Sequence, residues 1–185
     1  MFQNGHNNPN LVFIHANGFL PSSYSSMFKE LKKNYNIDNY LLQSLWNKKE
    51  NLYTIKDWNL FYTDFKRYIN KNNRQYIGLG HSIGGNIILR TALSNPKYFS
   101  RIILLDPTLF IPKIIYMWRL ISFIRLQKKC HPWISSTLNR KMIYKNYDDI
   151  FKSYRIKKVF SKIDDNNLKM YINSIIQKDN DEVHI

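Results

Sequence analysis

Short apolar segments alternate with helix-like segments over the first part of the chain. The apolar segments are centred on residues 10–16, 35–42, 75–81 and 101–106, and polar or turn-forming residues bound each of them. Short apolar runs with β-branched residues are typical of buried parallel strands. Since strands that alternate with helices form βαβ units with right-handed crossovers, the pattern predicts a parallel sheet.

Three segments between these strands carry apolar residues at helical spacing. The first spans residues 21–33, with Ser22 or Ser23 as a candidate N-cap, the second begins at Asp57, and the third spans residues 86–95. We expect the second and third strands to flank the first strand, with the fourth strand beside the third. The predicted fold class is therefore α/β, a doubly wound parallel sheet.

The character of the sequence changes after Pro112. Residues 113–178 are basic, aromatic and helical in pattern, and no segment among them has the features of a strand. We therefore expect a core over residues 1–112 and a helical cap over residues 113–185, the last few of which would begin a further core strand. A chain of 185 residues with 44% hydrophobic residues can bury such a core.

The composition excludes several classes of protein. A single cysteine, Cys130, rules out an intramolecular disulfide framework and a multi-cysteine zinc site. No apolar run is long enough to span a bilayer, and the first eight residues lack the layout of a signal peptide. These features predict a soluble, cytoplasmic protein without a transmembrane segment.

The net charge of +15 permits two interpretations. Residues 113–162 hold 13 Lys or Arg against two Asp, a net charge of +11, and such basicity is typical of proteins that bind nucleic acid or anionic membranes. The surplus Lys also accompanies many Asn, Ile and Tyr, a mixture that AT-rich coding sequence produces without selection for binding. Because no nucleic-acid-binding motif accompanies the charge, we expect no specific nucleic-acid partner.

The segment Gly78-Leu79-Gly80-His81-Ser82-Ile83-Gly84-Gly85 contains Gly-x-Ser-x-Gly between a predicted strand and a predicted helix. A serine on so sharp a turn has a strained backbone, and the residues two before and two after it must be small. Gly80 and Gly84 occupy those places. The turn would raise the Ser82 hydroxyl above the sheet edge and put the Ile83 N–H at a helix N-terminus, where it can stabilise an oxyanion.

A Gly-rich strand–helix turn can also bind phosphate. The segment Gly78-x-Gly80-x-x-Ile83 lacks the third glycine of the dinucleotide-binding fingerprint, and no acidic residue ends a following strand at the usual distance. The pattern therefore favours a nucleophile elbow over a phosphate-binding turn.

Two further motifs accompany the elbow: His15-Ala16-Asn17-Gly18-Phe19 after the first strand and Leu105-Asp106-Pro107 after the fourth. Together the three motifs resemble those of bacterial members of the α/β-hydrolase superfamily, over residues from about Leu11 to Pro112. The resemblance implies that Ser82 is the nucleophile and that backbone N–H groups of Asn17 and Ile83 form the oxyanion hole, with Gly18 or Phe19 as alternatives to Asn17. His15, Gly18, Gly80, His81, Gly84 and Gly85 would support these motifs, His15 in a structural role.

A serine needs a histidine as base and a carboxylate to orient that histidine, and in this superfamily both follow later strands. The chain ends at Glu182-Val183-His184-Ile185, so we expect a C-terminally truncated protein whose base and acid lie beyond residue 185. His6, His81, His131 and His184 are poor substitutes for the base. Asp106 is an alternative acid, although a structural role in its loop is favoured. The strand at 101–106 would then be an apolar edge.

A segment from Ile114 to Leu126 is apolar nearly all round, with basic residues interspersed. In a hydrolase such a helix lines an acyl pocket above the nucleophile, but it could equally pack on the core. It could also make weak contact with an anionic membrane surface, although its apolar and polar residues are weakly segregated.

From these features we expect a serine hydrolase that acts on an ester-type bond of a small-molecule ester or acyl substrate, without a metal or organic cofactor. The 185-residue chain itself would be inactive or nearly so. Thioesterase, acyltransferase and C–C hydrolase activities remain open because the fold supports all of them. A non-catalytic basic module that binds membranes or nucleic acid is the alternative from another class.

Overall fold

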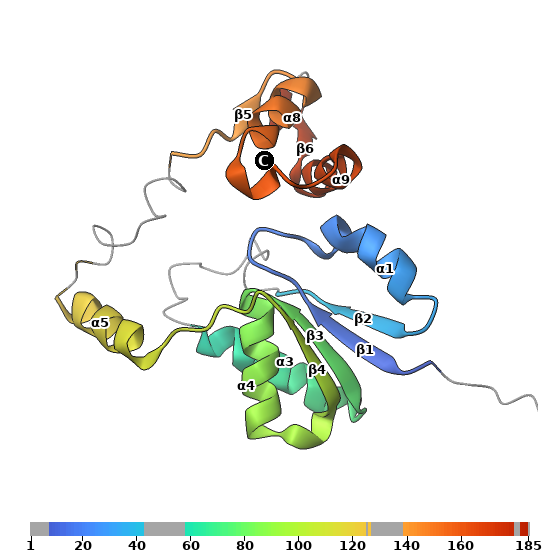
Figure 1. Cartoon of the computed structure of the whole chain (residues 1–185), viewed down its shortest axis with the longest axis vertical. Coiled ribbons are helices and arrows are strands. Elements are labelled where there is room, and N and C mark those ends of the chain that lie inside the picture. Colours follow the sequence, from blue (N-terminus) through green and yellow to red (C-terminus); the bar gives the residue numbers. More distant parts are fainter. Residues whose placement is uncertain (1–7, 43–57, 125, 127–138, 180–181, 185) are drawn as a thin grey trace, which may run out of the picture. The chain divides into compact units, whose positions relative to one another are not determined.

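The computed structural model describes residues 8–42, 58–124, 126, 139–179 and 182–184 (Figure 1). Three residues considered above, His6, Cys130 and His131, lie outside these ranges, as does Asp57. The helix expected to begin at Asp57 is described from Asn59 onward.

The centre of the structure is a parallel sheet of four strands. These are β1 (Asn10–Ile14), β2 (Asn36–Tyr40), β3 (Tyr76–His81) and β4 (Phe99–Leu105), in the order β2-β1-β3-β4 (Figure 1). Every pair is parallel, so the predicted order and direction are confirmed. Because parallel strands end at one edge, the loops after β1, β3 and β4 leave the sheet on the same side.

Helices cover both faces of this sheet. On one face lie the 3₁₀ turn η1 (Pro21–Tyr24) and α1 (Ser25–Leu31), and on the other lie α3 (Asn59–Asn72) and α4 (Ile83–Ser94), which the short η3 (Pro96–Tyr98) connects to β4 (Figure 1). The predicted segment at 21–33 thus begins as a 3₁₀ turn that contains Ser22 and Ser23, so neither serine is the N-cap that the sequence suggested.

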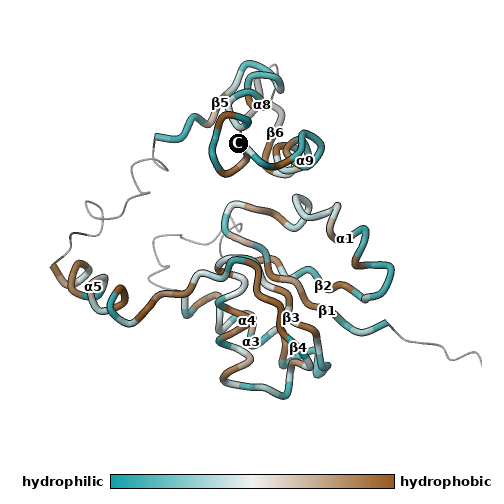
Figure 2. Tube along the Cα trace, viewed as in Figure 1, coloured by the Kyte–Doolittle hydropathy of each residue, from teal (hydrophilic) through white to brown (hydrophobic). Residues whose placement is uncertain are grey.

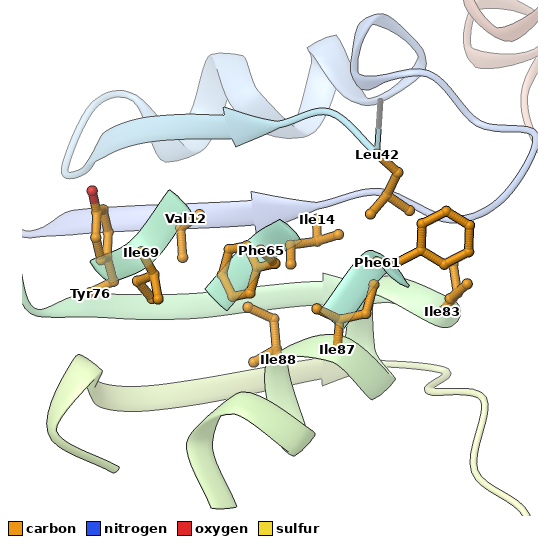
Figure 3. Close-up of a cluster of buried hydrophobic side chains, with 10 residues drawn as sticks. All are labelled: Val12, Ile14, Leu42, Phe61, Phe65, Ile69, Tyr76, Ile83, Ile87 and Ile88. Atoms are coloured by element: carbon orange, nitrogen blue, oxygen red, sulfur yellow. The ribbon is translucent and has the colours of Figure 1, made fainter. Parts of the chain in front are cut away.

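Alternate side chains of β1 point to opposite faces of the sheet, and each face has its own hydrophobic cluster. Leu11 and Phe13 face α1 and pack with Phe28. Val12 and Ile14 face the opposite side, where the larger cluster forms (Figure 3). Burying each such side chain fully contributes about 1.5–3 kcal/mol. The buried members of that cluster are Val12, Ile14, Leu42, Phe61, Phe65, Ile69, Tyr76, Ile83, Ile87 and Ile88.

A second group of elements follows β4. It comprises α5 (Pro112–Phe123), α8 (Tyr147–Arg155), η4 (Lys158–Phe160) and a small antiparallel sheet of β5 (Ile143–Tyr144), β6 (Gln177–Asp179) and β7 (Glu182–His184). The expectation of an all-helical region over 113–178 is therefore wrong for β5 and β6. Strands of two or three residues are too short to produce a period in the sequence, which is why they were not predicted.

The last strand also differs from expectation. Residues 182–184 were expected to begin a further strand of the parallel sheet, but β7 pairs with β5 and β6, antiparallel to both. The strand itself was predicted. Its partners could not be, because pairing depends on residues distant in sequence.

The contacts divide the chain into two compact units. One comprises Met1–Thr108 with Ile163–Ile175, and the other Leu109–Lys162 with Ile176–Ile185. The helix α9 (Asp165–Ile175) thus groups with the sheet and not with the other elements that follow residue 112. Its Tyr171 ring packs on Phe19, with 4.7 Å between ring centroids, and its Asn167 accepts a hydrogen bond from Ser26.

Two surfaces of the described chain are apolar. Ile103 and Leu105 of β4 remain 41% and 37% exposed, at the edge of the four-stranded sheet. Within α5, Leu120 and Phe123 are 62% and 85% exposed, and Figure 2 colours this helix largely as hydrophobic. Despite this apolar character, none of the described helices has the length and hydrophobicity that crossing a membrane requires.

Candidate active site

Ser82 lies between β3 and α4 with φ 54° and ψ −117°. A residue other than glycine at this positive φ is strained, at a cost of about 1–3 kcal/mol, and such strain is concentrated at functional sites. The Ser82 N–H donates to the Leu105 carbonyl at 3.0 Å, which ties the turn to the end of β4. The backbone therefore has the sharp strand–turn–helix form that the Gly-x-Ser-x-Gly motif predicts.

The glycines on either side of Ser82 leave no room for a side chain. A Cβ added to Gly80 would lie 2.5 Å from the carbonyl carbon of Gly84. A Cβ added to Gly84 would overlap the carbonyl oxygen of Ile14 and lie 2.9 Å from that of His15. The requirement for small residues at these two positions, inferred from the sequence, thus has a physical basis in backbone contacts.

The structure narrows the choice of oxyanion donors. Ile83 is the first residue of α4, where the N–H groups have no intrahelical partner and the helix dipole favours negative charge. In the loop after β1, the Phe19 N–H donates to the Ala16 carbonyl at 3.2 Å and is therefore occupied. Within the described part of the chain, the N–H groups of Asn17 and Ile83 have no partner. Asn17, or Gly18 at φ 77°, remains as the second donor.

His15 is fully buried and has a structural role. Its Nδ1 lies 2.8 Å from the Ala16 carbonyl, and its Nε2 lies 3.1 Å from the Leu42 N–H. Since the Leu42 N–H can only donate, Nε2 is unprotonated and Nδ1 carries the proton. Burial lowers the pKa of His15, which favours this neutral tautomer. The histidine thereby fixes the loop that presents Asn17.

Tyr24 connects the loop after β1 to the turn at Ser82. Its hydroxyl accepts a hydrogen bond from the Ala16 N–H at 3.2 Å and lies 2.7 Å from Nδ1 of His81. Burial raises the pKa of Tyr24 to about 12, so the phenol is neutral and can donate to His81. No sequence pattern indicates this contact, because 57 positions separate the two residues.

His81 is half-buried beside the candidate nucleophile. Burial lowers its pKa, and the nearby Asp106 carboxylate opposes that effect. Its Nδ1 contacts the Tyr24 hydroxyl, and within the described residues His81 makes no hydrogen bond with Ser82.

The Ser82 hydroxyl has a different partner. Its Oγ lies 2.9 Å from Oγ1 of Thr108, three residues beyond Leu105, the last residue of β4. The Thr108 N–H also donates to the Ser82 carbonyl at 3.1 Å, and Asn86 Nδ2 donates to the Thr108 carbonyl at 3.1 Å. Thr108 belongs to none of the three motifs, although it directly follows Leu105-Asp106-Pro107.

Asp106 directly follows β4, as the alternative acid would. Its side chain is exposed, and its carboxylate makes no hydrogen bond with the described residues. Its backbone has φ 41°, a left-handed conformation that Asp tolerates better than most residues. The residue therefore turns the chain into the loop that carries Thr108. This geometry is consistent with the structural role favoured from the sequence, although the turn is made by the backbone and not by side-chain capping.

The remaining candidates for a base are His184, which lies in β7 of the other compact unit, and His6 and His131, which lie outside the described residues. Across the described residues, no three His, Cys, Asp or Glu side chains gather in a way that could hold a metal ion. A shallow depression at the amino end of β4, lined by Pro96 and Phe99 among others, is at the opposite end of that strand from Ser82.

The chain is similar to known proteins, both in sequence and in structure. Residues 48–170 match the model of the family described as serine aminopeptidase, S33. No significant match was found among curated protein sequences.

Several solved structures resemble the chain. A thioesterase domain from the curacin biosynthetic pathway is 16% identical, with a TM-score of 0.71 over 96% of this chain and 63% of that one. A putative hydrolase from Rickettsia typhi is 16% identical, with a TM-score of 0.67 over 97% of this chain and 60% of that one. E-2-(acetamidomethylene)succinate hydrolase is 14% identical, with a TM-score of 0.66 over 96% and 60%. At such identities the likeness shows the fold alone, and the chain spans about six-tenths of the length of these proteins.

Proposed function

Because the chain belongs to the serine aminopeptidase S33 family of α/β-hydrolases, we propose that it carries the nucleophile and oxyanion hole of a serine hydrolase acting on an ester-type bond. Ser82 Oγ attacks the carbonyl carbon of a small-molecule ester or acyl substrate. The backbone N–H groups of Asn17 and Ile83 bind the oxygen of the tetrahedral intermediate.

One observation carries this proposal: Ser82 has φ 54° at the junction of β3 and α4, between two glycines whose backbones are in contact. A strained serine in that place is not required to form the sheet, because a glycine would adopt the same φ without strain. The Ile83 N–H beside it has no partner within the described residues, and it begins a helix of 12 residues. Strain and an available donor together favour chemistry at Ser82.

The proposal requires a base, and none of the described histidines of the first compact unit makes a hydrogen bond with Ser82. Both ring nitrogens of His15 are occupied by backbone groups, and His81 is bound to Tyr24. We therefore infer that the general base is a residue other than His15 and His81. The protein acts without a metal or organic cofactor in this proposal, and we place it in the cytoplasm.

The same serine and oxyanion hole could act on several classes of substrate. The names of the similar structures include a thioesterase and a hydrolase of an acetamidomethylene succinate, and an acyltransferase or a C–C hydrolase would use the same serine and oxyanion hole. An ester is the simplest of these, since attack by Ser82 yields an acyl-enzyme and an alcohol.

Hydrolysis of p-nitrophenyl acetate tests the proposal. An oxyanion hole without a complete triad retains about 10³–10⁴-fold over water, whereas the complete set adds about a millionfold in turnover. The 185-residue chain should therefore release p-nitrophenol slowly, and added imidazole, as an external base for Ser82, should accelerate that release more in the parent chain than in Ser82→Ala. Equal acceleration of the two proteins by imidazole would contradict the proposal. Ser161→Ala, at an exposed serine outside the elbow, is the control for general effects of substitution.

The exposed α5 favours a second candidate function, a basic module that makes weak contact with an anionic membrane surface. Lys113 and Arg119 are the charged residues of α5, and its Tyr116, Leu120 and Phe123 are each more than 60% exposed. Cosedimentation with vesicles of anionic and of neutral lipid tests this alternative, with duplex DNA as a second ligand. Nonspecific binding should vanish near physiological salt. Nanomolar binding that survives such salt, together with a cellular role unaffected by Ser82→Ala, would favour the binding module over the hydrolase.

A further inference from the structure

The loop after β4 places the side chain of Thr108 beside Ser82, the candidate nucleophile. Thr108 Oγ1 lies 2.9 Å from Ser82 Oγ, and both residues are half-buried. Two hydroxyl groups at this distance share one hydrogen bond, in which either can donate.

The backbone of Thr108 is fixed on both sides. Its N–H donates to the Ser82 carbonyl at 3.1 Å, an oxygen that also accepts from the Asn86 N–H at 3.2 Å. Its own carbonyl accepts from Asn86 Nδ2 at 3.1 Å. The backbone of Thr108 is thus held beside Ser82 by two hydrogen bonds that do not involve its hydroxyl.

The two residues before Thr108 determine the direction in which the chain runs from β4 toward Ser82. Asp106 has φ 41° and turns the chain back toward the elbow. Pro107 fixes the next φ and lies so close to Gly85 that a Cβ on that glycine would be 3.0 Å from the Pro107 Cβ. Three features therefore place Thr108 beside Ser82. They are the strained turn at Asp106, the fixed φ of Pro107, and the absence of a side chain at Gly85, against which Pro107 packs.

We propose that Thr108 is a positioning residue, whose hydroxyl donates a hydrogen bond to Ser82 Oγ when that oxygen becomes the nucleophile. This inference rests on the proposed role of Ser82. As the base removes the Ser82 proton, negative charge develops on Oγ, which can then only accept hydrogen bonds. Thr108 keeps its own proton and donates it toward that charge, and hydrogen bonds to charged acceptors are stronger than those to neutral ones. The bond also holds Oγ in one rotamer of its strained backbone.

A thiol in place of the hydroxyl makes this donation measurable without a base or a substrate. The substitution Ser82→Cys, with Cys130→Ser to remove the other thiol, provides an ionisable group at the same position. The pH dependence of its alkylation by iodoacetamide reports the pKa of that thiol, because the thiolate is the reactive form. A donor lowers the pKa by stabilising the thiolate.

Thr108→Val in this background removes the hydroxyl and keeps the shape of the side chain. It should raise the pKa of the introduced thiol by about one unit and slow alkylation about tenfold at pH values below both pKa values. Thr108→Ser keeps a hydroxyl and should restore the lower pKa. The alkylation rate at high pH, where all of the thiol is ionised, should be similar in the three proteins because accessibility is unchanged.

A purely structural role for Thr108 would change the unfolding midpoint or the alkylation rate at high pH, but not the pKa of the thiol. An unchanged pKa in Thr108→Val, with folding retained, would overturn the inference, as would a raised pKa in Thr108→Ser equal to that in Thr108→Val. If Thr108→Val fails to fold, Thr108→Ala serves as the second variant without the hydroxyl. These outcomes are independent of ester hydrolysis, so failure of the inference is distinguishable from failure of the proposed function.

Discussion

Tyr24→Phe removes a single oxygen atom that joins the loop after β1 to the elbow. That oxygen accepts from the Ala16 N–H at 3.2 Å and lies 2.7 Å from His81 Nδ1. The ring itself packs on Phe13, with 4.7 Å between centroids, and phenylalanine keeps that contact. The substitution therefore isolates the hydrogen bonds from the packing.

The expected loss follows from the burial of the two partners. Ala16 is 4% exposed, so water cannot replace the lost acceptor, and an unsatisfied buried N–H costs about 1–3 kcal/mol. His81 is half-buried and can regain a hydrogen bond from water, so it should add little. We expect the free energy of unfolding to fall by about 1–3 kcal/mol in total.

Urea unfolding followed by tyrosine and tryptophan fluorescence measures this difference, with the m-value as a check on two-state behaviour. Tyr35→Phe is the matched control, since Tyr35 packs in the same cluster and its hydroxyl has no hydrogen bond within the described residues. The control should change stability by less than about 0.5 kcal/mol. A Tyr24→Phe protein as stable as the control would refute the role assigned to Tyr24.

Two further predictions concern the residues around the elbow. Gly84→Ala should lower the free energy of unfolding in urea by about 1–3 kcal/mol or more, because its Cβ would overlap the Ile14 carbonyl. Stability equal to that of the parent chain would instead show that β1 and α4 can move apart. The free energy of unfolding should decrease as pH falls below 6.5, the ordinary pKa of histidine, because burial lowers the pKa of His15 in the folded chain and the unfolded chain binds the proton more readily. That decrease should approach roughly 1.4 kcal/mol per pH unit for His15 and should be smaller in His15→Gln, and an unchanged pH slope in His15→Gln would contradict the assignment of a buried neutral ring.

The sheet could be predicted from sequence because its signals are local. Each strand is an apolar run bounded by turn residues, and each helix between them has its own period, so a parallel sheet with right-handed crossovers follows from the sequence. The elbow was predictable for the same reason: Gly80, Ser82 and Gly84 are adjacent in sequence, and their spacing alone requires the tight turn.

The contacts that fix the site could not be predicted, because they join distant segments. Tyr24 and His81 are 57 positions apart, and Thr108 is 26 positions from Ser82. Neither Tyr24 nor Thr108 belongs to a motif, and no local pattern distinguishes them from other polar residues in loops. The antiparallel sheet of β5, β6 and β7 escaped prediction because its strands have only two or three residues each.

Labelling by a fluorophosphonate, located by peptide mapping, tests the central claim that Ser82 is a nucleophile. Because no described histidine makes a hydrogen bond with Ser82, the adduct should form slowly, and added imidazole, which can take the Ser82 proton, should accelerate it in proportion to its concentration. The exposed Ser161 is the internal reference, because it lacks an oxyanion hole and should remain unlabelled with or without imidazole. An adduct at Ser82 that grows with imidazole is the predicted result. The absence of any adduct at Ser82, or labelling no faster than at Ser161, would contradict the account.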